Sequence, residues 1–115
     1  MEWTFEDNKQ PRQLRSAEDI MSAVHETIDE TIDYFFLAPS GPIRNCSFMQ
    51  ATRYEGNRIH LEVCMVKTKG VKSIYSENCS PNMATILLQL FYTEGVVPDV
   101  SDWKFVGDFK EYYKK

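Results

Sequence analysis

The feature that most constrains the fold is a strict alternation of side-chain character in residues 59–65. Apolar side chains occupy every second position: Ile59, Leu61, Val63 and Met65. The positions between them hold His60, Glu62 and Cys64. A period of two is typical of a β-strand with one buried face. A shift of one residue would turn the whole apolar set to water, so this strand should pair in one register.

The preceding segment predicts a hairpin with this strand. Gly56-Asn57 suits a two-residue turn, because glycine adopts a positive φ without strain. The pairs that follow from such a turn are Tyr54 with Ile59, Thr52 with Leu61, Gln50 with Val63 and Phe48 with Met65. Phe48 and Tyr54 would then join the apolar side, and Arg53 would face His60 on the other side.

A third strand over residues 71–78 completes an antiparallel meander in residues 47–78. A four-residue turn at 67–70 would set Val63 opposite Ile74, Glu62 opposite Tyr75 and His60 opposite Glu77. The third strand carries Lys72, Ser73 and Ser76. Charged and short polar side chains discourage the addition of a further strand, so we place this strand near an edge of the sheet.

Residues 16–37 predict a long amphipathic helix. Ser16 suits the N-cap, and acidic side chains follow it in the first turn. Apolar side chains recur at helical spacing: Ile20, Val24, Ile28, Ile32 and Phe35. This stripe, about five turns long, suits the apolar side of the sheet. Pro39 and Pro42 should end the helix.

A second helix should start at Ser80-Pro81 and end before Gly95, which suits the position after a helix. Its apolar side chains point nearly all round: Met83, Ala84, Ile86, Leu87, Leu88, Leu90 and Phe91. Such a helix is buried on more than one side or covers a contact between subunits.

The two ends of the chain are less regular. Trp3 and Phe5 alternate as in a short edge strand. Trp103 and Phe105 also alternate, but Trp103, Val106, Phe109 and Tyr113 suit a helical face, so residues 103–113 fit a short strand followed by a helical tail, or a helix. Together the elements predict one α+β domain over residues 1–115, a two-layer sandwich. Two helices would cover one face of an antiparallel sheet built from the three-stranded meander and terminal edge strands.

Composition excludes several classes of function. A net charge of −4 argues against general binding to nucleic acid or to anionic membranes. No apolar run is long enough for a transmembrane helix, and the polar, acidic N-terminus does not fit a signal peptide. We therefore expect a cytoplasmic protein. Three irregularly spaced cysteines predict free thiols in a reducing compartment.

His60 is the first candidate for chemistry. In the predicted register it neighbours Arg53, Glu62 and Glu77, where it could act as a general base or as a pH-sensitive contact. We favour an ordinary cross-strand polar cluster as its explanation, because nothing nearby supplies a nucleophile, an oxyanion hole or a metal. Cys64 lies four residues along the same strand, about 13 Å away, too far for a dyad. Close cysteine pairs are absent, and the glycines do not cluster. We therefore predict no catalytic residue, no metal site and no cofactor.

Charge is unevenly placed along the chain. Residues 16–37 contain six acids and no Lys or Arg: Glu18, Asp19, Glu26, Asp29, Glu30 and Asp33. Residues 42–78 contain six bases against three acids. Two solvated faces explain this pattern, since surface charges are worth little. As binding surfaces, two candidates arise. One is an acidic helix face: Glu26, Asp29, Glu30 and Asp33. The other is the open sheet face: Arg53, His60, Glu62 and Tyr75.

Three segments carry a family resemblance: FMQA at 48–51, IHLEV at 59–63 and VPDVSDW at 97–103. They resemble small uncharacterised bacterial proteins, some of them similar to immunity proteins of polymorphic toxin systems. The resemblance implies a non-catalytic protein that binds and blocks a cognate toxin, and an acidic helix would suit a basic toxin domain. Two alternatives remain. One is a small-molecule binder or enzyme with a site near His60 between sheet and helices. The other is a structural homodimer joined through the second helix or an edge strand.

Overall fold

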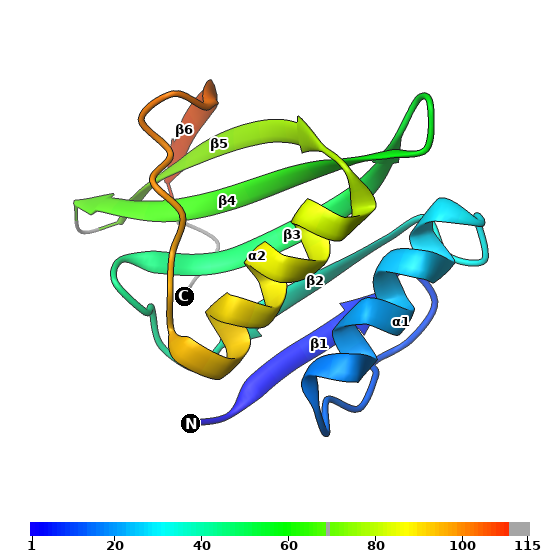
Figure 1. Ribbon diagram of the computed structural model, residues 1–115. Helices are drawn as coiled ribbons and strands as arrows, with labels where there is room; N and C mark the ends of the chain where they lie inside the picture. Colours follow the sequence, from blue (N-terminus) through cyan, green and yellow to red (C-terminus); the bar gives the residue numbers. More distant parts are fainter. Residues whose placement is uncertain (69, 111–115) are drawn as a thin grey trace.

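The computed structural model describes residues 1–68 and 70–110, and this part of the chain forms one antiparallel sheet and two helices (Figure 1). The elements are β1 (Trp3–Asp7), α1 (Ala17–Ile28), β2 (Tyr34–Pro39), β3 (Cys46–Tyr54), β4 (Arg58–Thr68), β5 (Val71–Cys79), α2 (Pro81–Glu94) and β6 (Lys104–Lys110). Within the described residues the sheet has six strands, in the order of the sequence. Both helices lie on the same face (Figure 1), so the α+β class and the antiparallel sheet are confirmed.

The core lies between the helices and the sheet. Buried side chains from the helices are Ile20, Ala23, Val24, Ala84, Leu88 and Phe91. Those from the strands are Phe5, Phe35, Leu37, Cys46, Met49, Ala51, Ile59, Leu61, Val63 and Cys79. The alternation in β4 is therefore confirmed for its first three apolar positions, while Met65 packs half-buried against the core.

The prediction that the first helix continues to residue 37 is wrong. The helix ends at Ile28, where the Asp29 N–H donates to the carbonyls of His25 and Thr27. Glu30 then takes a φ of 68°, which turns the chain out of the helix. Residues Tyr34–Pro39 form β2, paired with both β1 and β3. Phe35 and Leu37 point to the core two residues apart, as in a strand. The burial of Phe35 alone also fits the helical stripe that the sequence predicts, which is why the pattern did not distinguish the two structures.

The predicted first turn is one residue too short. Glu55, Gly56 and Asn57 form a three-residue loop, and Gly56 and Asn57 both have positive φ. Ile59 therefore pairs with Arg53, and His60 pairs with Thr52. The side chains that β3 buries under the helices are Cys46, Met49 and Ala51, instead of the predicted Phe48 and Tyr54. The longer loop places Tyr54 on the opposite face of the sheet, where it is 40% exposed.

The second hairpin is also shifted from its predicted register, with an irregularity near the turn at Val66 and Thr68. The observed pairs are His60 with Asn78, Glu62 with Ser76 and Val63 with Tyr75. The third strand of the meander is not an edge strand, because β6 pairs along its far side.

The terminal elements settle the open questions about the ends. β1 is a strand at one edge of the sheet, as predicted. Residues 104–110 form β6, in which Asp108 pairs with Ser73, so a helix from Asp108 is excluded as far as Lys110. The remaining predicted tail, including Tyr113, lies outside the described residues.

The second helix starts and ends as predicted. The Ser80 side chain accepts a hydrogen bond from the Met83 N–H, Pro81 occupies the first turn, and Gly95 has a φ of 67°. Across residues 1–68 and 70–110, neither helix is long and apolar enough to cross a membrane.

Candidate functional site

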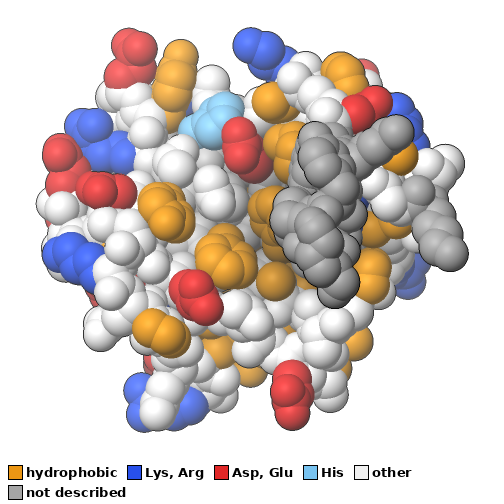
Figure 2. Space-filling model, turned by 180° about the vertical axis from the view of Figure 1, so that it is seen from behind, with side chains coloured by type: hydrophobic (Ala, Val, Ile, Leu, Met, Phe, Trp, Pro, Cys, Tyr) orange, Lys and Arg blue, Asp and Glu red, His pale blue; other side chains and the backbone are white. Residues whose placement is uncertain are grey.

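The face of the sheet that points away from α1 and α2 is called the outer face here. Its side chains follow from the register: Tyr34, Phe36, Phe48, Gln50, Thr52, Tyr54, His60, Glu62, Cys64, Ser76 and Asn78. Figure 2 views the molecule from this side and shows apolar side chains spread across it. No described helix covers this face, on which Tyr34 and Tyr54 are exposed, whereas Cys64 and Ser76 are buried.

Aromatic side chains dominate the part of the outer face formed by β2 and β3. The rings of Phe36 and Phe48 meet edge to face with their centroids 6.4 Å apart. With Gln50 they line a shallow hollow of about 190 Å³. Tyr34 and Tyr54 are 37% and 40% exposed. An exposed aromatic area of this kind is typical of a surface that contacts another molecule.

A second hollow, of about 470 Å³, lies where β6 begins beside β5. Its lining consists of Tyr54, His60, Glu62, Ser76, Glu77, Asn78, Lys104, Phe105 and Val106. We call it the His60 hollow. Lys104 pairs with Ser76, and β5 continues beyond this pair to Cys79. The hollow therefore forms a corner between the outer face and the first residues of β6.

His60 has an oxygen atom beside each ring nitrogen. Nδ1 lies 2.7 Å from Asn78 Oδ1, and Nε2 lies 3.3 Å from Glu62 Oε2. A neutral imidazole carries one N–H, so it can donate to only one of these oxygens, whereas the protonated ring donates to both. The cross-strand pairing with Asn78 fixes the ring, and Glu62 follows two positions along the same face.

Only part of the predicted sheet site comes together. His60 and Glu62 are neighbours as expected. Arg53 is not part of this group, because it pairs with Ile59 and its Nε lies 3.7 Å from Glu30 Oε2. Tyr75 pairs with Val63 and so points to the helix side, where its ring lies 5.6 Å from that of Phe105.

Six residues of the His60 hollow escaped sequence reasoning: Tyr54, Ser76, Asn78, Lys104, Phe105 and Val106. A three-residue first loop would have placed Tyr54 beside His60, and the correct second register would have given Asn78 instead of Glu77. Lys104 required knowledge of β6. The hollow lies on the outer face, so the predicted location of a site between sheet and helices is wrong.

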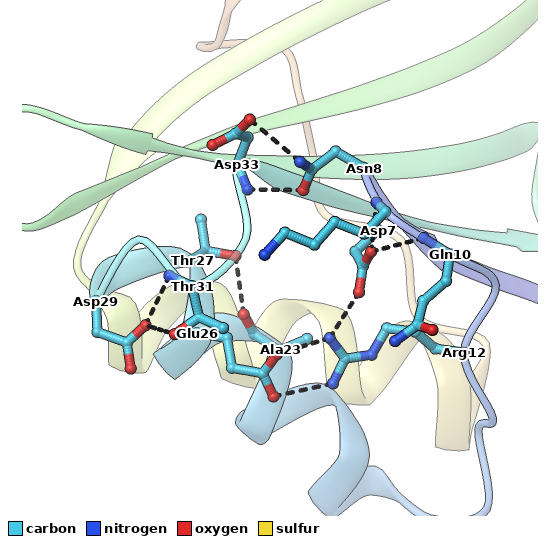
Figure 3. Close-up of polar contacts among 11 residues, drawn as sticks. Asp7, Asn8, Gln10, Arg12, Ala23, Glu26, Thr27, Asp29, Thr31 and Asp33 are labelled. Carbon is cyan, nitrogen blue, oxygen red and sulfur yellow. Dashed lines mark hydrogen bonds and ion pairs between the residues drawn. The ribbon is translucent and has the colours of Figure 1, made fainter.

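The four predicted acids do not form one helix face. Glu26 lies on α1, whereas Asp29, Glu30 and Asp33 lie between α1 and β2 and are exposed. Asp29 Oδ1 accepts from the Thr31 hydroxyl at 2.6 Å and from its N–H at 2.9 Å, and these bonds lower the pKa of Asp29. Asp33 Oδ2 accepts from the Asn8 amide at 3.1 Å (Figure 3). We call residues 29–33 the acidic loop.

Glu26 belongs to a partly buried ion-pair cluster with Arg12 and Asp7 (Figure 3). Arg12 donates to both oxygens of Glu26, at 2.8 and 3.1 Å, and to Asp7 Oδ2 at 3.0 Å. The Asp7 side chain is only 2% exposed. Burial raises the pKa of Asp7, but bonds from the N–H groups of Lys9 and Gln10 and from Arg12 outweigh it and hold that pKa below its ordinary value.

This cluster has a structural explanation. Both carboxylates are already bound by the guanidinium, and the cluster fastens the β1–α1 connection to α1. The hollow beside it, of about 530 Å³, is lined by three acids and three bases: Asp7, Asp19, Glu26, Lys9, Arg12 and Arg15. With equal numbers of acids and bases, this hollow favours no ligand of either sign.

All three cysteines are buried, Cys46 and Cys79 in the core and Cys64 on the outer face of the sheet. Burial raises the pKa of the Cys46 thiol to about 12, and burial also raises the pKa values of Cys64 and Cys79. A thiol is a nucleophile only as its thiolate, so all three are held in their unreactive form near neutral pH. In the described part of the chain, no three His, Cys, Asp or Glu side chains converge on a position that could hold a metal ion.

The outer face, with its aromatic area and the His60 hollow, is therefore the candidate site. It combines apolar contact area with a small set of polar groups held by strand pairing. Comparisons of the chain with protein-family models, with curated proteins and with solved structures gave no match.

Proposed function

We propose that this protein is a non-catalytic binding protein of the bacterial cytoplasm that inhibits a toxin or another protein partner, as immunity proteins do. The observation that supports the proposal is the aromatic area of the outer face. Aromatic side chains supply large contact areas with few rotatable bonds, and they are enriched among the residues that contribute most to protein interfaces. The area is broad and shallow, which suits the surface of a protein better than a small ligand.

The acidic loop adds a preference for a basic partner. It leads directly into Tyr34, at the margin of the outer face, so its exposed carboxylates lie beside the proposed interface. Complementary charge beside an interface speeds association more than it tightens the final complex. The charge of a basic toxin domain would therefore increase the rate at which it reaches this face.

The test is binding of the products of neighbouring genes, measured by calorimetry and by protection against the toxicity of the captured partner. We expect Tyr34→Ala with Phe48→Ala to weaken binding by at least about 30-fold, because each aromatic anchor contributes on the order of 1–2 kcal/mol. Met21→Ala on α1 is the matched control: its side chain is as exposed as that of Tyr34, but it lies on the helix side. Wild-type affinity in the double variant would refute the outer face as the interface.

The contribution of the acidic loop is measured in the same complex. Asp29→Asn, Glu30→Gln and Asp33→Asn remove the charges but keep an acceptor oxygen at each position. We expect this triple variant to associate up to about tenfold more slowly, with a weaker dependence on salt, while its dissociation rate changes little. An unchanged association rate at low salt would exclude the loop from partner recognition.

One observation favours a second candidate function, that of a homodimer subunit. On the solvent side of α2, Met83, Ile86 and Leu90 are 36–49% exposed at spacings of three and four residues. Residues 80–93 contain no charged side chain, whereas the exposed side of α1 carries Glu18 and His25. An apolar stripe at this spacing is the usual form of a helix–helix contact.

Sedimentation at increasing protein concentration tests the dimer. If α2 pairs with its copy, the wild-type chain sediments as a dimer at high concentration and Ile86→Lys with Leu90→Lys sediments as a monomer. Both positions are exposed, so the folded monomer should tolerate the lysines, and circular dichroism checks this. A wild-type monomer at every concentration would remove the homodimer.

A further inference from the structure

We propose that residues 111–115, which follow β6, cover the apolar half of the outer face, and that a protein partner has to displace them. The cover concerns this chain alone, whereas the displacement rests on the proposed function. Three observations carry it: a row of apolar side chains across the sheet, the uneven burial of the outer face, and the place where β6 ends.

The outer face is divided into an apolar half and a polar half. Strand pairing sets one row of residues side by side across β3 to β6: Phe48, Cys64, Ile74 and Gly107. Val66 lies beside this row, two positions after Cys64 on β4, and these five residues are called the apolar half. The side chains of the other half are mostly polar: Gln50, Thr52, His60, Glu62, Ser76, Asn78 and Lys104.

Burial is uneven across the same face. No described helix lies over it (Figure 1), yet Cys64 is 0% exposed, and Val66 and Ile74 are half-buried. Tyr34 and Tyr54, which lie towards the opposite end of the strands, are 37% and 40% exposed. Apolar side chains gain free energy when they leave water, so a covering group is favoured over the apolar half.

The end of β6 brings the chain to this half of the face. β6 ends at Lys110, three residues beyond Gly107. Cys64 lies two strands across and three residues along from Lys110, about 14 Å away at spacings of about 4.8 and 3.3 Å. Three extended residues span about 10 Å, and a tyrosine ring reaches beyond its own Cα, so Tyr113 can reach Cys64 and the side chains around it.

The composition of residues 111–115 suits such a cover. They read EYYKK, with two adjacent tyrosines followed by two lysines. A tyrosine ring buries a large apolar area while its hydroxyl stays in contact with water. The chain entropy lost on ordering the segment offsets part of this gain, so a partner with a larger interface can displace it.

The unaltered chain tests the cover directly. NMR of the isotope-labelled protein should show nuclear Overhauser contacts between the rings of Tyr112 or Tyr113 and the methyl groups of Val66 and Ile74. In a mixture of labelled and unlabelled chains, these contacts should arise within one chain. The absence of the contacts overturns the proposal. Contacts that join two chains assign the face to a second copy, which also overturns it.

The reactivity of the Cys64 thiol supplies a second test. Its reaction with iodoacetamide, followed by mass spectrometry, should be at least about tenfold faster in a chain cut after Lys110. Uncovering Cys64 admits the reagent and also removes part of the burial that raises the pKa of this thiol. Cys46 and Cys79 are internal controls for the fold, and their rates should stay the same.

Substitutions in the full chain repeat this test without the cut. Tyr112→Ala with Tyr113→Ala should also accelerate the reaction of Cys64. Glu111→Gln is the matched control, which keeps both rings and should leave the rate unchanged. Equal Cys64 rates in the wild type, the cut chain and the tyrosine variant would overturn the cover, and so would protection of Cys64 that arises only when a partner is added.

The cover and the proposed function fail separately. If the segment competes with the partner, the cut chain should bind the partner up to about tenfold more tightly, because its face no longer has to be cleared. A cut chain with a reactive Cys64 but unchanged partner affinity keeps the cover and refutes the displacement. A partner that binds Tyr34→Ala with Phe48→Ala at wild-type affinity refutes the interface, while the contacts of Tyr113 within the chain stand.

Discussion

Phe35→Ala lowers the free energy of unfolding by about 3–5 kcal/mol, whereas Phe36→Ala lowers it by less than about 1.5 kcal/mol. The large loss is expected because Phe35 is completely buried and its ring lies edge to face with Phe5, centroids 5.9 Å apart. Phe36 is half-buried on the outer face, where removal of its ring leaves no cavity in the core. Urea denaturation of the two variants measures both values.

The comparison of Phe35→Ala with Phe36→Ala tests directly whether β2 is a strand. In a strand, successive side chains point to opposite faces, so the two losses differ strongly. In the helix first predicted for residues 16–37, Phe35 lies on the apolar stripe and Phe36 flanks it, and both variants would lose stability. Similar losses in the two variants would therefore contradict β2.

Arg12→Met lowers the free energy of unfolding by about 3 kcal/mol, because it leaves the buried Asp7 carboxylate without its charge partner. Arg15→Met is the matched control. The Arg15 side chain is 78% exposed and its Nε lies 4.0 Å from Asp19, so its loss should cost at most about 0.5 kcal/mol. Thermal or urea denaturation at neutral pH measures the pair, and equal effects would show that the cluster contributes no more than a surface contact.

The same cluster predicts a dependence on pH. The pKa of Asp7 is lower in the folded protein than its ordinary value of 3.8, so ionised Asp7 stabilises the folded state above that value. This stability is lost as the pH falls through the lower, folded pKa. Without Arg12 the folded pKa lies closer to the ordinary value, so the stability gap between wild type and Arg12→Met should narrow below about pH 4. A constant gap down to about pH 2 would exclude Asp7 as its source.

The sequence was sufficient to predict the elements whose signals are local. Strand β4 has an alternation that no helix shares, and α2 has side-chain and backbone signals at both ends. In the segment from Ile28 to Leu37, the apolar pattern did not distinguish a helix from a strand. Ile32 and Phe35 are buried in the structure, as the helical stripe required, but Ile32 lies in a loop and Phe35 on a strand. The pattern identified which residues are buried and did not determine the backbone that buries them.

The candidate site depended on register, which is not a local property. His60 and Glu62 share a strand, so their proximity followed from alternation alone. The partner on the next strand depended on an irregularity in the pairing between Val66 and Thr68, which shifts the register by one residue and exchanges Glu77 for Asn78. The third wall of the hollow comes from β6, whose pairing with β5 joins residues far apart in the sequence. This explains why Lys104 and Phe105 could not be assigned to the site beforehand.

The arrangement of the strands has a consequence for how the molecule assembles. Because each strand pairs only with its neighbours in the chain, no strand has to be inserted between two that are already joined. The hairpins β3–β4 and β4–β5 close with short loops, and β2, then β1 and β6, can be added outward from them. Contacts close in sequence cost little chain entropy to form, so this topology favours rapid folding from the middle of the sheet towards both of its edges.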